Sequence, residues 1–103
     1  MVQNTQPVAQ QGTDNRIARL QNRVIDAVAW NLGVSSAYKK KITPDKSLVA
    51  DFKADSLDLA EILNTLEDEL GIEIPAKDFE EKKDVTVGEL IQYAAQKMYP
   101  QQQ

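Results

Sequence analysis

The sequence predicts an all-α protein: a small four-helix bundle of three main helices and one short helix, with a long loop between helices one and two. Three observations lead to this prediction. The chain has 103 residues, of which 42% are apolar, enough for one domain with a modest core. Three segments repeat apolar residues every three or four positions, as amphipathic helices do. Residues that favour helix ends, such as Asp14, Gly33, Gly71 and Thr86, flank those segments.

The first main helix is predicted over residues 15–32. Asp14 suits the N-cap position, and Gly33 follows the helix, where a left-handed residue is common. The face that packs on the core is an apolar stripe of Ile17, Leu20, Val24 and Val28. Trp30 lies roughly opposite this stripe, so we expect it either to face solvent or to be covered by the following loop.

The loop between helices one and two is predicted over residues 34–54. The Thr-Pro-Asp sequence at 43–45 favours a turn, and the lysines at 39–41 are expected to be solvated. A connection of this length needs apolar anchors. We therefore expect Leu48, Val49 and Phe52 to pack under the bundle.

The second main helix is predicted over residues 56–70, and Gly71 ends it. Its core face consists of Leu59, Ile62, Leu63, Leu66 and Leu70. A short helix is predicted at about residues 77–80. The last main helix follows Thr86, which forms a capping box with Glu89; its buried stripe is Val87, Leu90, Ile91, Ala94 and Met98. The folded domain is predicted over residues 14–99, between Gln-rich tails at 1–13 and 100–103 that are predicted to be disordered.

Two residue types that dominate active-site chemistry are missing. The chain has no cysteine, which excludes disulfides, thiolate metal sites and thiol nucleophiles, and no histidine, the usual base near neutral pH. We therefore predict a protein that is not an enzyme and has no metal site. No apolar run approaches the roughly 18 residues of a membrane span. Because the N-terminal residues do not resemble a signal peptide either, we predict a cytoplasmic location. We also expect the protein to be a monomer.

Charge is distributed unevenly along the chain. The net charge is −4, yet residues 51–84 contain twelve acids and four bases, whereas residues 1–50 contain three acids and seven bases. An acidic middle argues against a nucleic-acid partner, because nucleic-acid phosphates require a basic surface. It suits protein partners that present basic docking patches, and contacts of this kind weaken as salt rises.

Ser56 stands at the first position of the second main helix, beside Asp55 and Asp58. Serine and aspartate are favoured at helix starts, so this pattern alone is most often only a cap. A hydroxyl at this position is exposed, however, and the N–H groups of the first turn favour an attached anion by roughly 0.3–1 kcal/mol. The chain has no histidine base to activate Ser56, so it suits a permanent anionic attachment better than a nucleophile.

The Ala-Asp-Ser-Leu-Asp sequence at 54–58, followed by a helix that ends in LEDELGIEIP, resembles the acyl carrier protein family. The resemblance extends from about residue 17 to about residue 98. It implies that Ser56 is esterified with 4′-phosphopantetheine by a separate phosphopantetheinyl transferase that uses coenzyme A. It also implies that Asp55 helps to hold the magnesium ion during that transfer. On this arm the chain would carry acyl thioester cargo for fatty acid, polyketide or related lipid biosynthesis.

The resemblance also assigns two sets of residues. One set meets partner enzymes, which are acyl-transfer, condensing or modifying enzymes with basic docking patches; it consists of Leu57, Asp58, Ala60, Glu61, Asn64, Glu67 and Asp68. Helical spacing places several of these on one face. The other set lines the interior site for the acyl chain and consists of Ile62, Leu63, Leu66, Ile74, Leu90 and Ile91. A bundle needs each of these apolar residues for its core in any case.

Three residues depart from the family pattern. Where the family usually has Leu-Gly before Ala-Asp-Ser-Leu, this chain has Phe52 and Lys53, which puts a positive charge and a Cβ into that turn. Asn64 stands where the family often has methionine, so the partner face is less apolar. We interpret the chain as a specialised carrier for a dedicated pathway. Two alternatives stay open: a peptidyl or aminoacyl carrier of the same fold, and a helical protein-interaction module without a prosthetic group, in which Ser56 is only a cap.

Overall fold

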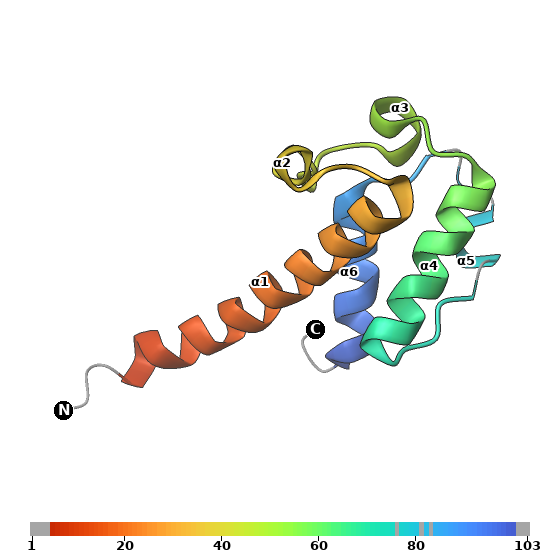
Figure 1. The fold of residues 1–103 in the computed structure, drawn as a ribbon. Helices are drawn as coiled ribbons and strands as arrows, with labels where there is room; N and C mark the ends of the chain where they lie inside the picture. The colour runs from red at the N-terminus through yellow and green to blue at the C-terminus, as the bar shows by residue number, and fades with distance from the viewer. Residues whose placement is uncertain (1–4, 76, 81, 83, 101–103) are drawn as a thin grey trace.

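The computed structural model describes residues 5–75, 77–80, 82 and 84–100. This part of the chain contains no strand and six helices: α1 (Thr5–Leu32), α2 (Ser36–Lys39), α3 (Leu48–Phe52), α4 (Ser56–Leu70), α5 (Lys77–Glu80) and α6 (Val87–Met98). The predicted all-α fold class is confirmed, with α1, α4 and α6 as the main helices. Figure 1 shows α4 and α6 beside the C-terminal part of α1, and α2 and α3 at the end of the bundle where α4 begins.

Helix α1 is longer than predicted. It begins at Thr5, so the predicted N-cap at Asp14 is wrong, and residues 5–13, predicted as part of a disordered tail, are helical. Glutamine and alanine favour a helix here, and Pro7 falls in the first turn, where its missing N–H costs no hydrogen bond. Residues 1–4 and 101–103 of the predicted tails lie outside the described residues, and the domain boundaries stay a prediction. The end of α1 is as predicted, because Gly33 follows Leu32 with φ +71°.

The core lies between α1, α4 and α6. The residues of their apolar stripes that are buried are Leu20, Val24, Val28, Ile62, Leu63, Leu66, Val87, Leu90, Ile91 and Ala94. Asn31 joins two of these helices, since its side-chain amide donates a 3.0 Å hydrogen bond to the Thr65 hydroxyl of α4. Trp30 lies outside the core with 81% of its surface exposed, so of the two predicted orientations it adopts the one that faces solvent.

The predicted loop contains two short helices, α2 and α3. Its turn is confirmed, because the Lys46 N–H donates to the Thr43 carbonyl at 3.0 Å. Leu48 is buried as predicted, but Val49 is 44% exposed, so that part of the prediction is wrong. The reason is the helical backbone of α3, in which consecutive side chains point about 100° apart and cannot share one buried face.

Side chains hold α5, at the predicted position of the short helix, against α6. Phe79 is buried, and its ring lies 5.1 Å from the ring of Tyr93. The Tyr93 hydroxyl donates to the Asp78 carboxylate, and burial together with this bond raises the pKa of Tyr93 to about 12.

Within the described residues, no helix combines the length and the apolar character that crossing a bilayer requires.

Candidate functional site

Ser56 is the first residue of α4, and it is exposed. The preceding residue, Asp55, is the N-cap, and its Oδ1 accepts a hydrogen bond from the Asp58 N–H at 2.9 Å. Oδ2 of Asp58 in turn accepts from the Asp55 N–H at 3.0 Å, which completes a capping box. In the sequence a capping box was predicted only at Thr86, although the spacing of the two aspartates is the same signal. This box fixes the first turn of α4 and therefore the position of Ser56.

The backbone of this first turn favours an anion at Ser56. The Asp58 N–H is used by the cap, and the Leu59 N–H donates to the Asp55 carbonyl at 3.0 Å. The first two N–H groups, those of Ser56 and Leu57, have no acceptor in the helical ladder. Together with the helix dipole they stabilise negative charge by about 0.3–1 kcal/mol, and the two capping carboxylates already use part of this effect.

Lys53 ends α3 in the left-handed conformation, with φ +58° and ψ +33°. Its N–H donates to the Val49 carbonyl at 3.0 Å, and the Ala54 N–H donates to the Leu48 carbonyl at 2.9 Å. These bonds close α3 with a left-handed C-cap, the position where glycine is preferred. Lys53 therefore adopts a conformation that glycine adopts without strain. The connection from α3 to α4 is only three residues long.

The segment before α6 holds α3 in place. The Asp84 carboxylate accepts hydrogen bonds from the Ser47 hydroxyl, from the Val49 N–H at 3.3 Å and from the Val85 N–H at 2.7 Å. The bond from Ser47 holds the pKa of Asp84 below its usual range. In addition, the Leu48 N–H donates to the Val85 carbonyl at 2.9 Å. Helix α3 is thus fixed at its start by this segment, and at its end it carries the loop that leads to Ser56.

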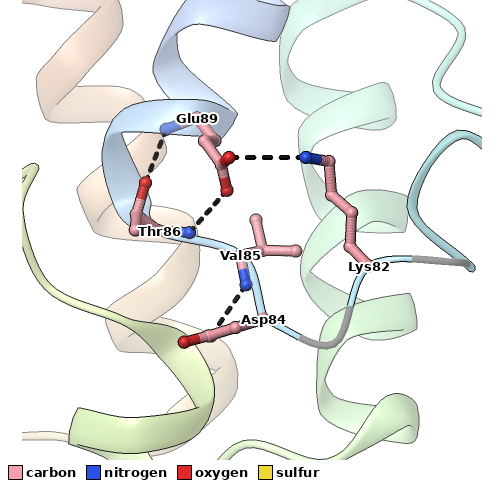
Figure 2. Close-up of polar contacts among 5 residues, drawn as sticks. All are labelled: Lys82, Asp84, Val85, Thr86 and Glu89. Carbon is pink, nitrogen blue, oxygen red and sulfur yellow. Dashed lines mark hydrogen bonds and ion pairs between the residues drawn. The ribbon is translucent and has the colours of Figure 1, made fainter.

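The start of helix α6 itself is capped (Figure 2). Thr86 Oγ1 accepts from the Glu89 N–H at 3.1 Å, and the Glu89 carboxylate accepts from the Thr86 N–H at 3.0 Å, so the predicted capping box is confirmed. Glu89 Oε2 also lies 3.4 Å from Lys82 Nζ. The start of α6 thereby holds Lys82, which is one wall of the pocket beside Ser56.

A pocket of about 270 Å³ opens beside Ser56. Its lining comes from α3 and the following loop, from α4, from α5 and from the segment before α6: Leu48, Val49, Ala54, Asp55, Ser56, Leu59, Ala60, Leu63, Phe79, Lys82, Asp84 and Val85. Most of these residues are apolar, so the pocket can hold a short apolar chain whose polar end stays near Ser56.

Of the six residues predicted to line an acyl-chain site, only Leu63 lines this pocket. The other five, Ile62, Leu66, Ile74, Leu90 and Ile91, are buried in the core, and their part in cargo binding stays a prediction. Sequence analysis did not assign Leu48, Phe79 or Val85 to such a site. These three residues lie in different segments of the chain, so no single sequence pattern groups them. The only sequence signal for any of them was the prediction that Leu48 is a buried anchor.

The predicted partner face divides into two groups. Leu57, with 65% of its surface exposed, lies on the surface of α4 together with Ala60, Glu61, Asn64 and Asp68. Asp58 and Glu67 are partly buried and serve the fold. Asp58 belongs to the capping box, and the Glu67 carboxylate accepts a hydrogen bond from the Ile74 N–H at 2.7 Å.

Among the described residues, no group of three or more carboxylates comes close enough together to hold a metal ion. Asp55 therefore belongs to no such group of carboxylates in this part of the chain. Its Oδ1 atom is committed to the cap, and any further ligand would meet Oδ2.

This chain is similar to known proteins over the range that contains the site. Residues 22–94 match a family model described as the phosphopantetheine attachment site. The matched range contains Ser56, its capping box and every residue that lines the pocket. The chain is also 38% identical over 79 residues to an acyl carrier protein from Syntrophobacter fumaroxidans (strain DSM 10017 / MPOB), in an alignment that covers 77% of this chain and 91% of that protein.

Proposed function

The chain belongs to the acyl carrier protein family, and we propose that it carries acyl intermediates on a 4′-phosphopantetheine arm attached to Ser56. The arm itself, covalently bound, follows from membership of the family. The observation that carries the assignment to Ser56 is the exposed hydroxyl at the first position of α4, at the edge of an apolar pocket.

The other serines support this assignment by contrast. Ser35 and Ser47 are the N-caps of α2 and α3, and their hydroxyls accept hydrogen bonds from the N–H groups of Tyr38 and Ala50. Ser36 opens a helix of only four residues. At α4 the cap is supplied by Asp55, so the Ser56 hydroxyl is not needed for capping. A serine released from this role can accept a permanent substituent without loss of the helix start.

The residues around Ser56 fit a phosphodiester. Attachment forms a bond between Ser56 Oγ and phosphorus, breaks the pyrophosphate P–O bond of coenzyme A and releases adenosine 3′,5′-bisphosphate. The chain has no histidine, so the transferase supplies the base that takes the hydroxyl proton. Asp55, whose Oδ1 accepts the N-cap hydrogen bond, would help to hold the magnesium ion during the transfer. When bound, the arm supplies the terminal thiol that holds the acyl group as a thioester.

The pocket beside Ser56 serves as the shelter for the acyl chain. Leu48, Leu63, Phe79 and Val85 would remove an apolar chain from water, which is favourable by roughly 0.8 kcal/mol for each buried CH₂ group. A volume of about 270 Å³ suits a short or medium-length chain. The buried residues Ile62, Leu66, Ile74, Leu90 and Ile91 form its rear wall if the helices separate to admit a longer chain.

The exposed residues of α4 serve as the docking surface for partner enzymes. Leu57 and Ala60 provide apolar contact, and Glu61 and Asp68 provide charge that attracts basic patches. Asn64 takes part through hydrogen bonds. The chain is not itself catalytic in this proposal, and it works in the cytoplasm as a monomer. Its partners are the phosphopantetheinyl transferase and the acyl-transfer, condensing or modifying enzymes of fatty acid, polyketide or related lipid biosynthesis.

Intact-mass measurement after incubation with coenzyme A, magnesium and a broad-specificity phosphopantetheinyl transferase tests this function. The wild-type protein is expected to gain the mass of one phosphopantetheine group. Ser36→Ala, a matched control at an exposed helix start, should gain the same mass, whereas Ser56→Ala should gain none. Absence of any gain in the wild-type protein, or a gain that persists in Ser56→Ala, would refute the assignment.

A further inference from the structure

The backbone at Lys53 adopts a conformation that does not favour lysine. Its φ is +58°, and among the described residues it is the only non-glycine residue with a positive φ. A residue with a Cβ is strained in the left-handed region, whereas glycine adopts that region freely. The turn therefore gives no structural reason for a lysine, and a strained residue beside a functional site suggests a functional reason.

The Lys53 side chain contributes little to the fold. It is exposed, and its Nζ lies 3.4 Å from the Ala50 carbonyl, at the long limit of a hydrogen bond. The ion pairs found among the described residues are Arg23–Glu69, Lys39–Asp26 and Lys82–Glu89, and Lys53 takes part in none of them. Its charge is therefore directed to solvent, where an approaching molecule can meet it.

Lys53 places a single positive charge beside the acidic helix. Residues 51–75 contain eight acids, and Lys53 is the single base among them. It lines a groove of about 580 Å³ between the end of α1, α2, α3 and the first turn of α4, and Tyr38 and Asp58 line the same groove. Lys41 lies over the ring of Tyr38, with its Nζ 5.6 Å from the ring centroid. On the loop side the groove therefore presents the positive charge of Lys53 together with the negative charge of Asp51, and on the α4 side it presents the negative charge of Asp58.

Any enzyme that acts at Ser56 comes close to Lys53. The two Cα atoms are three residues apart in sequence and so at most about 11 Å apart in space. A protein–protein interface of ordinary size buries about 800 Å² on each partner, a patch roughly 30 Å across. A partner whose interface is centred on Ser56 and Leu57 therefore places some of its own side chains near Lys53.

We propose that Lys53 selects partner enzymes by charge, an inference that rests on the proposed function. The surface fits an enzyme that presents basic side chains to α4 and an acidic side chain to Lys53. It disfavours an enzyme whose docking surface is basic throughout, because such a surface would bring a positive charge against Lys53. Lys53 thus determines which enzymes act on the carrier, and it does not touch the reacting atoms.

The test compares the rate of phosphopantetheine attachment in four variants, with a transferase whose docking surface is basic. Lys53→Gln removes the charge and keeps the Cβ, Lys53→Glu reverses the charge, and Lys53→Gly removes both the charge and the strain. Lys40→Gln is the matched control, because Lys40 is exposed but lies outside the groove of Lys53. Initial rates are read by intact mass at low and high salt, and urea unfolding verifies that each variant is folded.

Lys53→Gln should be modified about twofold faster than the wild-type protein at low salt, since one unit charge about 10 Å away in water alters a rate by about that factor. Lys53→Glu should be about fourfold faster, and Lys40→Gln should be unchanged. The differences should vanish near 1 M salt, where the screening length falls to about 3 Å. Equal rates for the wild-type protein, Lys53→Gln and Lys53→Glu would overturn the proposal and leave the proposed function intact. Acceleration by Lys53→Gly alone would assign the effect to backbone strain and would overturn it as well.

A binding measurement separates charge selection from contact with the attached arm. In the Ser56→Ala background no arm can form, and the affinity for the same transferase should still rise when Lys53→Gln is added. An affinity that does not respond would mean that Lys53 contacts the arm and not the enzyme, which contradicts the proposal. Absence of modification in every variant with Ser56 intact would instead refute the proposed function, and the inference would fall with it.

Discussion

The starts of α4 and α6 use the same capping device. At α4 the reciprocal bonds between Asp55 and Asp58 are 2.9 and 3.0 Å long, and at α6 those between Thr86 and Glu89 are 3.1 and 3.0 Å long. In both helices an oxygen at the N-cap accepts from the third N–H group, and a carboxylate three residues later reaches back. Judged by their caps alone, the two helix starts are equivalent.

The surroundings of the two first turns are opposite. Val87, the first residue of α6, is completely buried, and its N–H donates to the Lys46 carbonyl at 3.0 Å. The Gly88 N–H donates to the Pro44 carbonyl at 2.8 Å, and a Cβ at Gly88 would lie only 3.0 Å from that oxygen. In α4 the equivalent residues, Ser56 and Leu57, are exposed. A cap therefore fixes where a helix starts. Whether the first turn is buried in the core or exposed to a binding partner depends on the chain segments that pack over it.

The buried start of α6 lies next to residues that support the exposed start of α4. Val85, just before α6, accepts a hydrogen bond from Leu48 of α3, and Asp84 binds the N-cap of α3. Carbonyls of α3 in turn accept from Lys53 and Ala54, which lead directly into α4. The position of Ser56 thus depends on a chain of contacts that begins at Asp84 and Val85, just before α6.

The largest expected difference between the two helix starts is in packing. Val87→Ala should lower the free energy of unfolding by about 2–3 kcal/mol, because it removes fully buried methyl groups. Leu57→Ala should change it by less than about 0.5 kcal/mol, because most of that side chain is exposed. Urea unfolding followed by circular dichroism measures both. Equal destabilisation by the two substitutions would mean that the first turn of α4 is also covered.

Removing the caps should affect stability equally and modification unequally. Asp55→Ala and Thr86→Ala should each cost about 1 kcal/mol, the typical value for loss of an N-cap side chain. Only Asp55→Ala should also slow attachment of phosphopantetheine, because Asp55 neighbours Ser56. Parallel unfolding and initial-rate measurements test this contrast. An equal loss of rate in Thr86→Ala would show that the rate reports overall stability and not the position of the cap.

The link between the two helix starts should weaken in acid. Because the pKa of Asp84 is lowered in the folded protein, its contribution is fully present above the ordinary pKa of an aspartate. That contribution is lost as the pH falls through the lower, folded value. Asp84→Asn should therefore be less stable than the wild-type protein near pH 7, and the two should converge in strong acid. A difference in stability that does not vary with pH would contradict this account of Asp84.

The smallest expected effect is at the left-handed turn before α4. Lys53→Gly should raise the free energy of unfolding by about 0.5 kcal/mol, because relief of backbone strain is partly offset by the greater freedom of glycine in the unfolded chain. Lys53→Gln keeps the Cβ and should leave stability unchanged, so it is the control. Thermal unfolding of the three proteins measures the effect. A loss of stability in Lys53→Gly would mean that the lysine side chain supports the turn.

Local signals predicted the helix boundaries that matter most. The ends of α4 and the start of α6 follow from short-range chemistry, namely an aspartate before Ser56, the glycine at 71 and the capping box at Thr86. The short helix α3 was missed because its start depends on Asp84 and Val85, more than thirty residues away in sequence. A helix of four or five residues is too short to be stable without such distant contacts.

The candidate site was predicted only in part, for a similar reason. Ser56 and Asp55 are neighbours in sequence, so their motif is visible there. The pocket combines Leu48, Phe79 and Val85 from separate segments, and no periodicity within one helix identifies such a set. Conversely, Ile62 and Leu90 have the apolar spacing of both a core and a cargo site, and spacing alone does not distinguish them.

In the proposed function Ser56, at the exposed start of α4, is the serine that accepts the prosthetic group, and no other serine of the chain does so. Peptide mapping by tandem mass spectrometry, after reaction of the wild-type protein with coenzyme A, magnesium and the transferase, tests it most directly. All of the added mass is expected on the peptide that contains Ser56, with none on peptides that contain Ser35, Ser36 or Ser47. Phosphopantetheine on any of those three serines, or an unmodified Ser56 in protein that has gained mass, would contradict it.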